Sequence, residues 1–138
     1  MDDADVLDPG NCRREIEELH AFFVEWYTGR RDDFERMERA IGPGFEMVTP
    51  DGDCLDREAV LAMVRDGNDQ YDPGEFDIEI RNVAAVDTGP DHALVRYEEW
   101  QSGPESADGR LSSVLFRPRE GAPREIAWAS LHETWLTA

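Results

Sequence analysis

The feature of this sequence that most constrains its fold is a change of hydrophobic periodicity near residue 76. Before that point, apolar residues recur at steps of three and four, as they do on one face of an α-helix. From there on, apolar and polar residues alternate, as around Phe76, Ile78 and Ile80, and this period is typical of half-buried β-strands. Helices followed by a run of strands predict an α+β domain with an antiparallel sheet.

Capping and stop signals divide the first part of the chain into three helices. Asp8-Pro9 is a strong helix start, because aspartate accepts hydrogen bonds from free N–H groups and proline fits the first helical position. Glycine is expected to end each helix where the chain turns. The predicted helices lie between Asp8 and Gly29, between Asp32 and Gly42, and between Asp56 and Gly67.

The second part divides into four long strands, joined by turns rich in glycine, proline and aspartate. The alternation slips near Asn82 and Val83, which predicts a β-bulge. A short strand over residues 45–49 precedes the third helix and is followed by a Pro-Asp-Gly turn. The long strands are predicted over residues 76–86, 92–101, 109–117 and 124–137.

The last predicted strand carries large apolar residues on both faces. With strict alternation, Trp128 and His132 share one face, whereas Leu131, Glu133 and Trp135 share the other. A strand that is apolar on both sides needs cover on both sides. We therefore expect helices over one face of the sheet and a second copy of the chain over the other, which predicts a homodimer through the sheet face.

The chain of 138 residues is strongly acidic, with 32 acidic residues against 14 arginines, no lysine, and a formal net charge of −18. This charge opposes binding to nucleic acid, whose phosphates need a basic surface. It also costs self-repulsion at low ionic strength. Because about 1 M salt shortens the Debye length to roughly 3 Å, the composition favours a salt-rich cytoplasm.

The length is that of one domain. Residues 1–10 are acidic and lack the basic-then-apolar order of a signal peptide. We interpret them as an N-terminal tail that precedes a single domain, residues 11–138. No apolar run approaches the roughly 18 residues that a membrane-spanning helix needs. The expected location is cytoplasmic, with no membrane partner.

Four segments carry a family resemblance: EIEELHAFFVEWY in the first helix, FEMVTPDG before the third, ALVRYEEW in the sheet and WASLHETW in the last strand. Together with the element order over residues 12–137, they resemble the NTF2-like superfamily, in its SnoaL-like or DUF4440-like branch. The resemblance implies a cystatin-like cone, in which three N-terminal helices pack on a strongly curved antiparallel sheet. It also implies a homodimer and a pocket between sheet and helices. The superfamily holds isomerases, dehydratases, epoxide hydrolases and cyclases, so the fold does not select the function.

The strand over residues 92–101 offers polar groups for this pocket. Ala93 and Val95 begin one face with the small and apolar residues that resemble the inward face of the family, so Tyr97 and Glu99 are expected to follow them inward. Glu99 and His132 are the candidate catalytic residues. The alternative is that the aromatic residues simply fill the core. The candidate ligand-binding residues are Trp26, Tyr27, Met47, Thr49, Tyr97 and Trp128.

Two enzyme types of the superfamily allow a sharper comparison. Ketosteroid isomerases keep an aspartate where this chain has Thr49, and a threonine hydroxyl is far too weak a base at neutral pH. Limonene-epoxide hydrolases use an Arg-x-Asp on one strand and an aspartate on a late strand, which Arg96, Glu98 and Glu133 resemble. A spacing of two puts Arg96 and Glu98 on one face, suited to orient a water. The alternative for these three residues is ion pairing on a wet or interfacial face.

The sequence therefore leaves three functions open. The first is a homodimer that binds a small, mostly apolar molecule in the cone. The second is an acid–base enzyme in the same pocket, a hydrolase, lyase or isomerase, and the third is a dimer whose cone is filled. We expect no metal, because three scattered histidines do not supply convergent ligands. We expect no cofactor, because no phosphate-binding loop is present.

Overall fold

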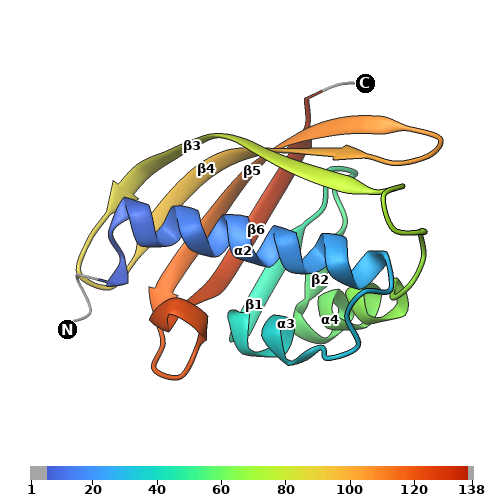
Figure 1. Ribbon diagram of the computed structural model, residues 1–138. Coiled ribbons are helices and arrows are strands. Elements are labelled where there is room, and N and C mark those ends of the chain that lie inside the picture. The colour runs from blue at the N-terminus through green and yellow to red at the C-terminus, as the bar shows by residue number, and fades with distance from the viewer. Residues whose placement is uncertain (1–5, 137–138) are drawn as a thin grey trace.

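The computed structural model describes residues 6–136, over which helices pack against one side of a six-stranded sheet (Figure 1). The predicted α+β class and cystatin-like cone are confirmed. The helices are α2 (Pro9–Tyr27), α3 (Glu35–Ala40) and α4 (Arg57–Asp66). The strands are β1 (Ile41–Val48), β2 (Cys54–Asp56), β3 (Asp77–Thr88), β4 (Ala93–Ser102), β5 (Ala107–Pro118) and β6 (Ile126–Trp135), with a 3-10 turn, η1 (Pro123–Glu125), before β6.

The sheet has the strand order β2-β1-β6-β5-β4-β3. Neighbouring strands are antiparallel, except that β1 and β6 run parallel. The closing strand β6 therefore lies inside the sheet and joins the short pair β1–β2 to the meander β3–β5. The sheet curves around α2, which crosses its concave side, while α3 and α4 lie near one end (Figure 1).

Helix α2 begins where its sequence predicts. The Asp8 side chain accepts a hydrogen bond of 2.9 Å from the backbone N–H of Asn11, which satisfies one of the free donors at the helix start. The helix buries Ile16, Leu19 and Phe22 almost completely against the sheet. Burial of each such side chain contributes about 1.5–3 kcal/mol, so this stripe fixes α2 along the concave face.

The folded chain begins earlier than the sequence predicts. Val6 and Leu7 are buried in the core, although we assigned both to a solvated tail over residues 1–10. The first five residues of that tail lie outside the described residues. Two apolar residues among the acids of this segment were the signal for an earlier start.

Strand β1 also begins earlier than expected, at Ile41 rather than at Phe45. It runs through Gly42-Pro43-Gly44, which we interpreted as a helix stop. Its pairing with β6 is irregular over this stretch, where Ile41 pairs with Trp128 and Glu46 with Ser130. A side chain at Gly42 would lie 3.1 Å from the Trp128 carbonyl oxygen, so glycine permits the close approach of the two strands.

Bulges in β3 and β6 set the faces of the sheet. The predicted bulge in β3 is confirmed, since the register shifts between Arg81 and Ala84 and Asn82 has a φ of 55°. A further shift in β3, between Ala85 and Asp87, and a bulge in β6 were not predicted. Phe116 pairs with Trp128 and Leu115 with Ser130, so one residue of β6 between these two has no partner. Beyond this bulge the alternation of inward and outward side chains is reversed.

Candidate functional site

A cavity of about 100 Å³ lies between α2, α4 and the concave face of the sheet. Its lining includes Met63, which is 49% exposed. Its apolar walls include Phe23, Phe45, Met47, Val60, Trp128 and Leu131. Its polar groups are His20, Tyr27, Tyr97, Glu99, Gln101, Arg110 and Glu133. A mostly apolar wall with a few convergent polar groups is the usual form of a small-molecule site.

His20 of α2 and Glu99 of β4 form a buried ion pair at this cavity. His20 Nε2 lies 3.0 Å from Glu99 Oε1, and His20 Nδ1 lies 2.7 Å from the Ile16 carbonyl oxygen. A carbonyl and a carboxylate can only accept, so both ring nitrogens donate and the ring is an imidazolium. Burial lowers the pKa of His20, but the charge and hydrogen bond of Glu99 raise it more. Burial raises the pKa of Glu99, yet His20 brings it down to about 2.

Glu133 of β6 is the second carboxylate of the cavity, and its state differs from that of Glu99. Burial, followed by the charge of Glu99, raises the pKa of Glu133 to about 7. Its hydrogen bonds come from Ser112 Oγ at 2.8 Å and, at a longer 3.4 Å, from Arg110 Nη1. One carboxylate is held ionised and the other is balanced between its two forms. Such a divergence is typical of sites that move protons.

Tyr97 and Arg110 present donors that nothing satisfies. Among residues 6–136, Tyr97 Oη and Arg110 Nε are the only buried side-chain nitrogen or oxygen atoms without a hydrogen-bond partner. The Ser112 hydroxyl lies close enough to the Tyr97 phenol to lower its pKa slightly, but it is not placed to accept a hydrogen bond from it. Burial and the charges of Glu133 and Glu99 raise the pKa of Tyr97 well above its ordinary value, so the phenol keeps its proton. An unpaired buried donor costs about 1–3 kcal/mol.

A third buried carboxylate, Glu15 of α2, lies outside the cavity lining. Arg36 donates to both of its oxygens, at 2.7 and 3.2 Å, and Trp128 Nε1 donates to Oε2 at 3.0 Å. Its side chain is fully buried. Burial raises the pKa of Glu15, while Arg36 and Trp128 oppose that rise. Every oxygen of this carboxylate has a fixed partner, so the group anchors α2 to α3 and β6.

The structure brings several predicted site residues together and leaves others apart. Tyr27, Met47, Tyr97, Glu99, Trp128 and Glu133 line the cavity. Trp26 packs instead against Phe34 and donates to the Val64 carbonyl at 2.7 Å, and Thr49 closes the turn before β2 through its contacts with Asp53.

His132 does not face the cavity, and our placement of it there is wrong. The prediction assumed strict alternation from Trp128 onward, but the bulge in β6 adds one residue and reverses the faces. Leu131 and Glu133 therefore line the cavity, whereas His132 is exposed.

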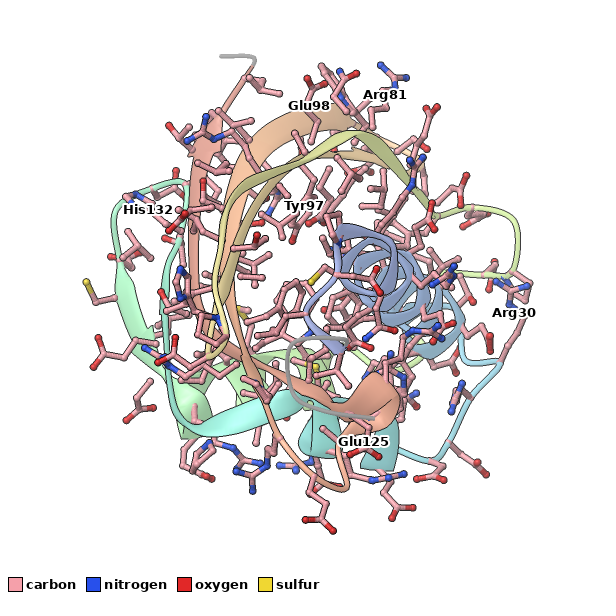
Figure 2. All side chains as sticks on the ribbon, turned by 90° about the vertical axis from the view of Figure 1, so that its left-hand side faces the viewer. Arg30, Arg81, Tyr97, Glu98, Glu125 and His132 are labelled. Atoms are coloured by element: carbon pink, nitrogen blue, oxygen red, sulfur yellow. The ribbon has the colours of Figure 1, made fainter. Side chains whose placement is uncertain are left out.

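The resemblance to an epoxide hydrolase site is also overturned. Arg96 is exposed, and Glu98 accepts hydrogen bonds from Asn82 and Trp100, away from the cavity. Figure 2 shows Tyr97 inside the curve of the sheet and Glu98 outside it. Glu133 is on the opposite side of the sheet from Arg96, so the three residues do not converge.

Sequence reasoning missed His20 and Arg110 as site residues. In the sequence, His20 lies one residue from the apolar stripe of α2, a position typical of a boundary residue. Arg110 shares a strand face with Ser112, Val114 and Phe116, the last two of which are fully buried. A charged residue that alternation places on the same face as buried residues was the signal that could have identified Arg110 as a site residue.

No three histidine, cysteine or acidic side chains within residues 6–136 are arranged to hold a metal ion. None of the helices in this part of the chain is both long and apolar enough to cross a bilayer.

The cone and its lined cavity define the chain as an NTF2-like protein, and comparisons with known structures agree. An NTF-2 like protein of unknown function from Pseudomonas aeruginosa is 29% identical, with a TM-score of 0.82 over 91% of this chain and 98% of the other. The CaMKII hub of S. rosetta is 13% identical, with a TM-score of 0.66 over 88% of this chain and 95% of the other, a likeness that shows the fold alone. The SnoaL-like or DUF4440-like branch stays a prediction.

The chain belongs to the family described as the C-terminal part of sucrose-6-phosphate phosphohydrolase, whose model matches residues 14–137. Sucrose-phosphatase 2 of Nicotiana tabacum is 22% identical over 144 residues, covering 96% of this chain and 34% of that protein. The chain spans about a third of the length of the curated relatives it matches.

Proposed function

We propose that the protein binds, in the cone cavity, a small molecule with an apolar body and one hydrogen-bond-accepting end. The observation that carries the proposal is the Tyr97 hydroxyl, a buried donor without a partner at the wall of the cavity. A buried donor is costly unless something accepts from it. An acceptor on the ligand relieves that cost and orients the molecule.

The size of the cavity limits the ligand. A cavity of about 150 Å³ holds a benzene molecule, and this one is about 100 Å³. Because the cavity is smaller than that but is open to solvent, with the exposed Met63 in its lining, a five-membered ring would fill it and extend into its mouth, whereas a disaccharide phosphate, such as the names of the relatives suggest, is far too large. The ligand is therefore different in kind from the substrate named for those relatives.

The test compares cyclopentanone with cyclopentane, which has the same ring and no acceptor. Binding is followed by the rise in melting temperature and by NMR shifts of the cavity methionine methyl groups. We expect cyclopentanone to bind about fivefold more tightly than cyclopentane, as one net hydrogen bond of about 1 kcal/mol would give. The Tyr97→Phe variant should lose that difference. Equal binding of both probes to both proteins would refute the proposal.

The alternative is an acid–base enzyme in the same cavity, and the divergent states of Glu99 and Glu133 favour it. A general base works best when its pKa is close to the operating pH. Glu133 is such a base. We expect the wild-type protein to exchange the α-protons of cyclopentanone for deuterium at pH 7, as measured by NMR. Glu133→Gln should abolish the exchange and Glu98→Gln, on the outer face, should retain it. Exchange at the uncatalysed rate would favour binding alone.

A homodimer through the outer face of the sheet belongs to this proposal. Leu94, Leu111 and Leu115 are partly exposed on the face that α2 does not cover. The structural neighbours named as a CaMKII hub and as an association domain support self-association. Sedimentation at high salt should give two chains, and a monomer at micromolar concentration would count against this interface. The acidic composition supports a salt-rich cytoplasm as the setting.

A further inference from the structure

We propose that the cavity takes a small monocarboxylic acid, whose carboxylate accepts hydrogen bonds from Tyr97 and Arg110 and shares one proton with Glu133. This inference rests on the proposed ligand-binding function and names the chemical class of the ligand. Its starting point is that the two unpartnered buried donors of the described chain both belong to the lining of one cavity.

The strand register places these two donors side by side. Tyr97 pairs with Ser112 across β4 and β5, and Arg110 is two residues from Ser112 on the same face. Such diagonal neighbours are about 7–8 Å apart, within reach of two long side chains. A carboxylate offers two acceptor atoms on one carbon, and a guanidinium is planar and suited to it. One ligand group thus satisfies both donors.

Arg110 is already balanced by Asp108, so a ligand carboxylate needs Glu133 to be neutral. His20 and Glu99 cancel each other as an ion pair. Arg110 contacts Asp108 Oδ1 at 3.1 Å and Glu133 Oε1 only at 3.4 Å, and its Nε is free. When Glu133 carries a proton, a ligand carboxylate can replace its charge beside Arg110. Two carboxylates in one buried site share a proton rather than both ionise.

The groups that face Glu133 decide its state. On β6 itself no neighbouring titratable group faces Glu133 from the cavity side, because His132 points away from the cavity. Arg110 favours the charged form, and Glu99 and burial disfavour it, with a net pKa of about 7. The titratable or charged groups around it are His20 and Tyr27 from α2, Tyr97 and Glu99 from β4, and Arg110 from β5. Above pH 7, binding therefore takes up one proton from solvent. This proton forms an O–H bond on one of the two carboxylates and a hydrogen bond to the other, and no other covalent bond changes.

Isothermal titration calorimetry with cyclopentanecarboxylate tests the inference on the full chain. The matched neutral probe is cyclopentanecarboxamide. The acid should bind about tenfold more tightly at pH 6 than at pH 8, because Glu133 passes from mostly protonated to mostly ionised. At pH 8, heats in two buffers of different ionisation enthalpy should report an uptake close to one proton. The amide should show no dependence on pH.

Two variants and one control complete the experiment. Glu133→Gln should bind the acid equally well at both pH values, Tyr97→Phe should weaken binding about fivefold, and Glu98→Gln should match the wild type. If cyclopentanone binds but the carboxylate does not at pH 6, the inference is wrong and the proposed function stands. If neither binds, both are wrong. Carboxylate binding without a pH dependence overturns the shared proton.

Discussion

The molecule buries carboxylates in two regions that differ in how completely their polar groups are paired. Glu15 accepts three hydrogen bonds from Arg36 and Trp128, so both of its oxygens have fixed partners, although burial still raises its pKa. At the cavity, His20 compensates the charge of Glu99. Glu133 shares Arg110 with Asp108, so its charge is only partly compensated. The first region is complete without a ligand. The second holds two unused donors and a carboxylate that changes its state near neutral pH.

One residue connects the two regions, which makes the contrast informative. Trp128 donates from its ring nitrogen to Glu15 and contributes its ring to the cavity wall. The hydrogen bond to Glu15 therefore holds the Trp128 wall of the cavity in place. A site is expected to be supported by rigid neighbours in this way. The difference teaches that burial of an acid does not by itself mark function, whereas incomplete pairing beside a cavity does.

The largest effect is expected when Glu15 loses its ion-pair partner. Arg36→Met should leave Glu15 buried without its main partner and lower the free energy of unfolding by about 3–5 kcal/mol, measured by urea denaturation at pH 7. Arg39→Met is the matched control on the same helix. Its guanidinium donates to the Gly121 carbonyl at the surface, so its loss should cost less than about 1 kcal/mol. Equal costs for both variants would contradict the structural role of Glu15.

The next effect is the pH dependence of stability that comes from Glu133 in the cavity. The folded-state pKa of Glu133, about 7, lies above the ordinary value of 4.5. Folding therefore favours the protonated form, and the stability that this group contributes is present below pH 4.5 and is lost as the pH rises through 7. The shift corresponds to about 3 kcal/mol. Glu133→Gln should thus be about 2–3 kcal/mol more stable than wild type at pH 8.5 and nearly equal to it at pH 4.

Glu99→Gln provides the opposite sign as a control. The pKa of Glu99 is lowered to about 2 from an ordinary value of 4.5, so its contribution is present above pH 4.5 and is lost as the pH falls toward 2. This variant should be destabilised at pH 7 and converge with wild type in acid. If both variants respond to pH in the same direction, the two carboxylates are not in different states.

A smaller effect concerns the unused donor. Tyr97→Phe removes a buried hydroxyl that has no partner, so the free energy of unfolding should stay unchanged or rise by about 1 kcal/mol. Ser112→Ala is the comparison, since it removes a buried hydroxyl that donates to Glu133 at 2.8 Å, and it should cost about 1–2 kcal/mol. Chemical denaturation at pH 7 measures both. A clear loss of stability in Tyr97→Phe would mean that its hydroxyl is already satisfied.

Much of the fold could be predicted because local signals were strong. The Asp8 cap, the bounds of α4 and the bulge at Asn82 are each set by a few neighbouring residues. The pairing of β1 with β6 could not be predicted in the same way. It joins residues about 85 positions apart, and the glycines that permit it also resemble a helix stop.

The site was less predictable because one residue decided it. A single unpaired residue in β6 moved Glu133 into the cavity and His132 out of it. Nothing in the local pattern of that strand marks the extra residue. His20 was hidden differently, because its partner Glu99 is 79 positions away and becomes a neighbour only after folding.

The smallest expected effect is a difference between salt responses. Screening by salt acts on exposed acids such as Asp32 and Asp33 and leaves a buried pair almost untouched. Potassium chloride should therefore raise the melting temperatures of the wild type and of Arg36→Met together, saturating below about 1 M if repulsion is the whole cause. The loss of unfolding free energy caused by Arg36→Met should change by less than about 0.5 kcal/mol between 0.1 and about 2 M salt.

A loss that falls steeply with salt would show that solvent reaches Glu15, which would end the contrast between a buried, fully paired carboxylate and an open cavity. Melting temperatures that stay flat or fall would instead remove the case for a salt-rich setting.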